Sequence, residues 1–222
     1  MSIRFHYHAL ASGVSGHLTL PVEHLIEVQA ASALPSTGGH CTSRVEGFRH
    51  QHIVSFNSAH TGTTGSESAT HFHTLATSTI EGLNILNVVT ADRIVARMAS
   101  SCAKANHEHF TTFAGSRFEN LRIAGCPVEI VMDAERLKSS SRTEKAQHGA
   151  FAKATKVEGY PGVEPLPDGA LYIPEFGKIY LAEYLTTACY QSITMLRVVL
   201  GCAVEGHLGV AHAAGDGDPP IH

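Results

Sequence analysis

The chain contains no tryptophan, and only 16% of its 222 residues are charged. Lys and Arg (16) are outnumbered by Asp and Glu (20), so the basic surface of a nucleic-acid-binding protein is absent and we expect no nucleic-acid partner. No apolar run reaches the length of about 18 residues that a membrane-spanning helix needs, and we expect no membrane span. A surface with so little charge is typical of a self-associating protein and predicts a homo-oligomer.

The five cysteines are an odd number, and no two of them are spaced as C-x-x-C. This pattern argues against a disulfide framework and against a zinc ribbon, and it is typical of reduced thiols in a cytoplasmic protein. The start of the chain, MSIRFHYHAL, lacks the basic residues and apolar run of a signal peptide. We therefore expect a cytoplasmic location, with an extracellular one as the alternative.

Motifs of the common catalytic families are also missing. The sequence has no G-x-S-x-G, no phosphate-binding P-loop and no H-E-x-x-H. Glu81 and Asp92 are of the residue type that glycoside hydrolases use in pairs, but solvated turn residues are the simpler interpretation. We predict no catalytic residue, and the sequence favours a protein that is not an enzyme.

Alternation of apolar and polar residues is the main pattern that the chain does contain. His71–Arg97 is its most regular stretch, rich in β-branched and aliphatic residues, with Leu83 and Ile85 at the strand period of two. Ser192–Leu200 and the alternating part of Arg117–Met132 have the same character. These stretches predict a mainly β protein, organised as a single domain over residues 1–222.

A short unit recurs along the chain: an apolar residue, usually Glu, then Gly or Asn, then a bulky residue. Its copies begin at Val14, Val45, Ile80, Phe118 and Val204. Gly and Asn both tolerate a left-handed backbone, and the spacing of the first four copies is in the range of repeated supersecondary units. The unit predicts a stacked β-solenoid or β-helix-like architecture. A two-sheet β-sandwich satisfies the same alternation and is the alternative.

Three other segments of the chain do not show this alternation. Residues 58–70, SAHTGTTGSESAT, are rich in Gly, Ser and Thr and predict an exposed loop. Residues 133–156 are rich in Ala and Lys with Asp133 as a candidate N-cap, which predicts a short helical segment within an insertion at about 133–169. Residues 213–222 predict a flexible tail.

Several motifs together resemble those of a known group of proteins. They are Gly82–Leu86 running into Thr90–Asp92, the Asn-Leu-x-Ile-x-Gly of Arg117–Gly125, and Phe176–Glu183. The combination resembles a family of uncharacterised bacterial β-rich proteins, and the first element is similar to β domains of bacterial "choice-of-anchor" surface proteins. The resemblance implies a β fold and a bacterial origin, and it implies no activity, substrate or cofactor.

Sixteen histidines are the most unusual feature of the composition. Four pairs have the form His-x-His, where roughly one would arise by chance. In a strand such residues project from one face, so both imidazoles can bind one Zn or Cu ion. The predicted metal ligands are His6, His8, His50, His52, His71, His73, His107 and His109.

Of these pairs, His50 and His52 stand out because they continue the apolar alternation of Phe48, Val54 and Phe56. A buried imidazole there would need a partner for each ring nitrogen. The available third ligands are His40, His60 and Glu67, and none of them is fixed by the spacing.

Two classes of function follow from these patterns. The first is a self-associating structural or binding protein without a catalytic site. The alternative is a transition-metal-binding protein or metal-dependent enzyme that uses the His-x-His pairs. A glycan-binding β module is disfavoured by the absence of tryptophan.

Overall fold

The computed structural model describes residues 5–18, 23–133, 147–157, 163–166, 169–187 and 190–201. Within these residues the protein is mainly β, with sixteen strands and no helix. No helix in this part of the chain is therefore long and apolar enough to cross a membrane.

Most strands belong to one large antiparallel sheet in the order β12-β10-β9-β6-β5-β4-β3. Its four long strands are β3 (Gly39–His50), β4 (Val54–Glu67), β5 (His71–Ile85) and β6 (Val89–Ala103). Its shorter strands are β7 (His109–Thr112), β8 (Arg117–Glu119), β9 (Arg122–Ile123), β10 (Cys126–Met132) and β12 (Ala152–Val157). The strands β7 and β8 both pair with β6.

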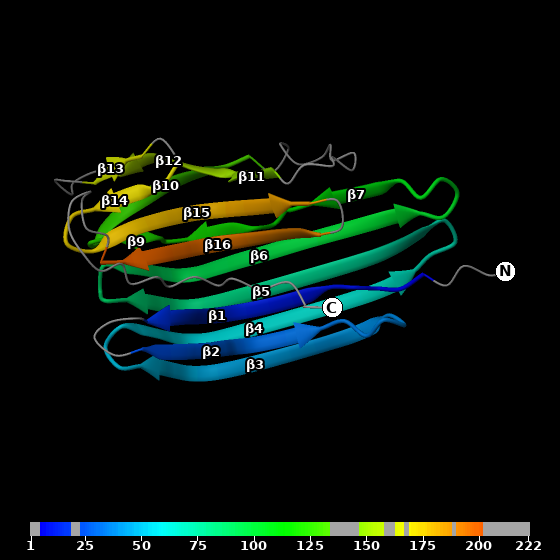
Figure 1. Cartoon of the computed structure of the whole chain (residues 1–222), viewed down its shortest axis with the longest axis horizontal. Helices are drawn as coiled ribbons and strands as arrows, with labels where there is room; N and C mark the ends of the chain where they lie inside the picture. Colours follow the sequence, from blue (N-terminus) through cyan, green and yellow to red (C-terminus); the bar gives the residue numbers. More distant parts are fainter. Residues whose placement is uncertain are drawn as a thin grey trace.

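A second layer of strands lies over one face of the large sheet (Figure 1). One part of this layer is the hairpin of β1 (Leu10–Leu18) and β2 (His24–Ala33). The other part is a five-stranded antiparallel sheet. Its strands are β11 (Gln147–Ala150), β13 (Glu164–Pro165), β14 (Leu171–Ile173), β15 (Gly177–Thr186) and β16 (Gln191–Leu200).

The apolar core fills the space between the two layers. The backbone of β1 lies so close to the large sheet that a Cβ added at Gly13 would be 3.4 Å from the Cβ of Ala59. Phe56 of β4, Ile80 of β5 and Ile179 of β15 are among the buried residues of this core. We call the covered side of the large sheet the inner face and the opposite side the outer face.

The stacked solenoid predicted from the recurring unit is not found in the described residues. Their strand pairs are all antiparallel, whereas coils of a solenoid stack as parallel strands. Short reversals between strands set this pattern. At the β5–β6 turn, for example, Leu86 and Asn87 adopt φ values of 52° and 56°, as the two central residues of a type I′ turn do, and the N–H of Val88 donates to the carbonyl of Ile85 at 3.0 Å.

The helical segment predicted near residues 133–156 is not seen either. Residues 147–150 and 152–157 form β11 and β12, and the described part of the predicted insertion contains strands only. Antiparallel pairing of β12 with β10 overrides the helix propensity of this Ala- and Lys-rich segment. Residues 134–146 and the predicted tail 213–222 lie outside the described residues.

The loop predicted at residues 58–70 was wrong over most of its length. Strand β4 continues to Glu67 and pairs with β3 and β5 along both of its edges. Thr61 and Thr63 are fully buried on its inner face. Threonine is β-branched and therefore suits a strand, although a stretch of Gly, Ser and Thr is typical of loops.

Candidate interaction surface

A row of polar residues crosses the outer face of the large sheet, strand by strand. Glu46 of β3 faces Ser58 of β4, which faces Glu81 of β5. Arg93 of β6 lies between Glu81 and Glu119 of β8. The recurring sequence unit supplies all three glutamates, and its copies in β3, β5 and β8 alternate with β4 and β6 across one sheet.

Each strand places two successive residues on the outer face at this row. In β5, Ile80 and Leu83 are both buried, and Glu81 and Gly82 lie between them. Buried or partly buried apolar residues flank each of the pairs that we group as the transverse row: Glu46–Gly47, Asn57–Ser58, Glu81–Gly82, Asp92–Arg93 and Glu119–Asn120. The extra outer residue resets the alternation, so that apolar side chains remain on the inner face at both ends of the strand.

Backbone conformation explains why Gly or Asn recurs in the unit. Gly47, Gly82 and Asn120 have φ values of 67°, 64° and 52°, all in the left-handed region that these two residue types tolerate. At Gly82 a side chain would also displace its neighbour, since an added Cβ would lie 2.2 Å from Nδ2 of Asn57.

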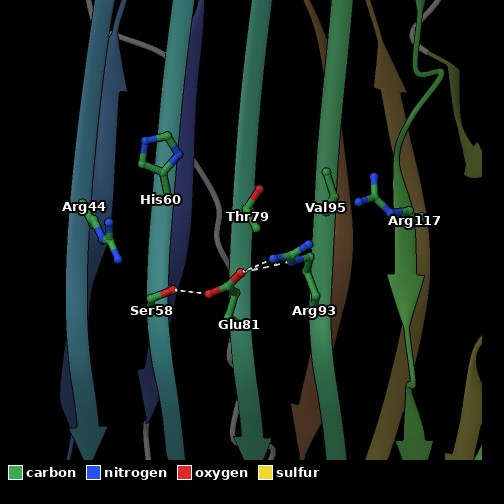
Figure 2. Close-up of a pocket in the computed structure, with 8 residues that line it drawn as sticks. All are labelled: Arg44, Ser58, His60, Thr79, Glu81, Arg93, Val95 and Arg117. Carbon is green, nitrogen blue, oxygen red and sulfur yellow. Dashed lines mark hydrogen bonds and ion pairs between the residues drawn. The ribbon is translucent and has the colours of Figure 1, made fainter.

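Glu81 is the most fully bonded carboxylate of the transverse row. It accepts hydrogen bonds from Nε of Arg93 at 3.1 Å and from Nη2 of Arg93 at 2.5 Å, and one from Oγ of Ser58 at 2.9 Å (Figure 2). These bonds from Arg93 and then from Ser58 lower the pKa of Glu81 below its ordinary value. The same contact with Glu81 raises the pKa of Arg93, so the pair stays ionised near neutral pH.

The other two glutamates of the row also have arginine partners. Nη2 of Arg44 lies 2.5 Å from Oε1 of Glu46, and Nε of Arg117 lies 2.7 Å from Oε1 of Glu119. The side chains of the Arg44–Glu46 pair are 64% and 63% exposed. Ion pairs in such contact with water contribute little to stability, so this pair adds little to holding the fold.

A second, mainly basic row runs beside the transverse row. It contains Arg44, His60, Thr79 and Arg117, which follow one another across β3, β4, β5 and β8 with Val95 of β6 between the last two. These side chains surround a shallow hollow on the outer face, with Glu81 at its border (Figure 2). The surface thus presents nitrogen donors in one row and carboxylates in the next, a pattern that can recognise a partner of complementary charge.

Farther along the strands the outer face carries fewer charges. A second shallow hollow there is bordered mostly by uncharged residues, including Leu75, Ala99, Phe110 and Thr112, together with Arg97. The outer face therefore joins a charged band to a band of mostly uncharged side chains.

The predicted metal ligands His71 and His73 lie on this outer face at the start of β5. Their ring centroids are 5.8 Å apart. Nδ1 of His71 lies 2.9 Å from the hydroxyl of Thr70, and Nε2 of His73 lies 3.4 Å from that of Ser68. Of the four predicted pairs, this is the one whose rings the structure places in contact.

His50 and His52 do not share a strand face. His50 ends β3, whereas His52 lies in the turn before β4. The ring of His50 instead stacks on His24 of β2, with centroids 4.5 Å apart. Its Nε2 is buried and has no hydrogen-bond partner among the described residues.

The remaining two pairs lie outside regular strand geometry. His6 and His8 are exposed in the residues that precede β1. His107 occupies a turn with φ of 55°, and His109 begins β7. Across the described residues, no three His, Cys, Asp or Glu side chains lie close enough together to hold a metal ion.

Residues 5–164 match the family described as Domain of unknown function (DUF8256). The chain belongs to this family. The part shared with DUF8256 contains the β1–β2 hairpin and every strand of the large sheet, whereas β14, β15 and β16 follow it. No curated protein and no solved structure matches the chain.

The arginine partners of the transverse row were missed by the sequence reasoning. The recurring unit was the signal that could have indicated this row. It places a Glu at the same position in several strands, and these residues form a row once the strands are aligned. Glu81 and Asp92, considered as a carboxylate pair, each bond to a different side chain. Asp92 accepts a hydrogen bond from Nδ2 of Asn120 at 2.9 Å, and Glu81 faces Arg93.

Proposed function

We propose that this chain is a self-associating structural or binding protein that acts through the large sheet. Its interaction surface would be the outer face, with its charged band, and the edge of that sheet at β3. The proposal assigns the charged rows to recognition of a partner surface and the inner face to stability.

The observation that carries the proposal is the unequal cover of the large sheet. The inner face packs against β1, β2, β15 and β16, whereas none of the described strands covers the outer face. The ion pairs there are ordered by strand register and remain 40% exposed or more. Ordered charge on an uncovered surface gives orientation and specificity to association.

The test is the mass of the full chain in solution, measured by sedimentation equilibrium over a wide concentration range. We expect a mass that rises with concentration to a multiple of 23.7 kDa. Replacing Arg44 and Arg117 together by Ala should weaken association, because both guanidiniums of the basic row are lost. A chain that stays at 23.7 kDa throughout would contradict self-association.

Binding of Zn or Cu is a second candidate function, supported by the adjacent rings of His71 and His73. Titration calorimetry with each metal ion would detect it. We expect binding that the double substitution His71→Ala/His73→Ala abolishes and that the matched substitution His107→Ala/His109→Ala leaves intact. Equal heats for both variants would assign the binding to other histidines, and no heat with the parent chain would reject this candidate.

A further inference from the structure

The two ends of the large sheet are built differently. At one end, β3 is a continuous strand of 12 residues, and in the described part of the chain it pairs only with β4. Toward the other end, β6 pairs with the short strands β7, β8 and β9, of four, three and two residues, and the last strand of the sheet, β12, has six. Short and interrupted strands protect a sheet against added strands, whereas a long regular edge offers a row of unpaired N–H and C=O groups.

The sequence of β3, GHCTSRVEGFRH, also lacks proline and lysine, two residue types that often block an edge. Its charged residues Arg44, Glu46 and Arg49 select for a partner strand of complementary charge. Its irregularity at Gly47 belongs to the transverse row, and the neighbouring strands of the sheet share that row. The edge is therefore open to a strand that fits this row.

We propose that β3 pairs in antiparallel orientation with β3 of a second copy, so that two large sheets join into one continuous sheet. The two-fold axis would pass between Glu46 and Gly47. This inference rests on the proposed self-association and names the surface that performs it.

The transverse row is the feature of β3 that β3 of a second copy matches. An added strand must place two successive residues on the outer face at this row, or its apolar residues would turn away from the inner face. In the antiparallel register, Glu46 of each copy lies opposite Gly47 of the other, and Val45 lies opposite Phe48. Val45 and Phe48 pack against the core of their own copy, so both strands keep their apolar side chains on the inner side.

In the same register Arg49 of each copy lies directly opposite Arg44 of the other, and Glu46 lies next to both guanidiniums, so that its carboxylate would separate two like charges. Arg49 is exposed, and it has no ion-pair partner among the described residues. Each Arg49 would become a diagonal neighbour of Glu46 in the other copy, a separation that long side chains span. Glu46 would then lie between its own Arg44, at 2.5 Å, and the new guanidinium. The two-fold axis creates this arrangement twice.

Reversing the charge at position 46 tests the pairing in the full chain. The substitution Glu46→Arg would place like charges on both sides of the joined edge. We expect the dissociation constant of the dimer to rise by about tenfold or more. The matched control is Glu27→Arg, which makes the same charge change on exposed β2. Sedimentation measures the dissociation constant, and circular dichroism confirms that the variants retain their strands.

A compensating variant distinguishes pairing from a general charge effect. Combining Glu46→Arg with Arg49→Glu restores opposite charges between the copies, so we expect association to return toward the parent value. An oligomer unaffected by Glu46→Arg, or weakened equally by Glu27→Arg, would overturn the β3 assignment and leave self-association standing. A parent chain that is monomeric at every concentration would instead overturn the self-association itself.

Discussion

The inner face of the large sheet is closed by a second layer of strands, whereas the outer face carries exposed ion pairs and small polar residues. Both faces come from the same four long strands, so adjacent residues of one strand have opposite environments. Ile80 is 7% exposed in the core, and its neighbour Glu81 pairs with Arg93 at the surface. The comparison separates residues that hold the fold from residues available for contact.

At the transverse row, the alternation of inner and outer residues along each strand changes phase. Before the row in β5, buried Ala76 and Ile80 occupy even positions, and after it buried Leu83 occupies an odd one. Two successive outer residues make this change of phase, and without them the apolar residues beyond the row would point outward. One feature of the backbone therefore keeps the core continuous and places the charges in a row.

The two faces should differ most in how much unfolding free energy is lost when two adjacent residues of β5 are replaced. Ile80→Ala removes a core side chain and should lower the free energy of unfolding by about 2–5 kcal/mol. Thr79→Ala, on the outer face, should change it by about 0.5 kcal/mol or less. Urea denaturation of both variants measures the two values. Equal losses would contradict the assignment of opposite faces.

A smaller effect should arise at the transverse row itself. Gly82→Ala forces a side chain onto a left-handed backbone and against Asn57, and should cost about 1–3 kcal/mol in unfolding free energy. Gly47→Ala is the matched control, because its φ is 67° but no atom lies within 4 Å of the added Cβ. The difference between the two denaturation curves isolates the close approach to Asn57. Identical losses would show that backbone strain alone matters.

The sequence predicted the mainly β class because alternation and β-branched residues are local properties of each strand. It also identified the recurring unit and the left-handed tolerance of its Gly or Asn, which the φ values at Gly47, Gly82 and Asn120 confirm. The order of strands is not local. Copies of one unit can stack as coils or align across hairpins, and the turns between strands decide between these outcomes.

The candidate surface was harder to predict for the same reason. Glu81 and Arg93 meet because the tight turn of Leu86, Asn87 and Val88 sets the register of β5 and β6. Much of strand β4 was predicted as a loop because it is rich in Gly, Ser and Thr. The burial of Thr61 and Thr63 depends on the neighbouring strands and on the layer that covers them, which the local sequence does not reveal. The His50/His52 prediction was wrong about a shared face because β3 ends between them, a boundary that alternation does not reveal.

The smallest effect should be the pH dependence of the outer face. The pKa of Glu81 is lowered in the folded protein, chiefly by its hydrogen bonds from Arg93, so its ionised form favours folding. This contribution is present above the ordinary carboxyl value of 4.5 and is lost as the pH falls through the lower value of the folded state. Urea midpoints of the parent and Glu81→Gln should therefore differ near neutral pH and converge in acid.

Arg93→Met provides the control for this last prediction. Without the guanidinium, Glu81→Gln should alter the midpoint far less, and the difference should depend less on pH, because only the bond from Ser58 remains. An unchanged pH dependence in the Arg93→Met background would mean that Glu81 draws its low pKa from elsewhere on the outer face. Since both side chains are 41% exposed, added salt should also shrink the effect, and Ile80→Ala should show no comparable salt dependence.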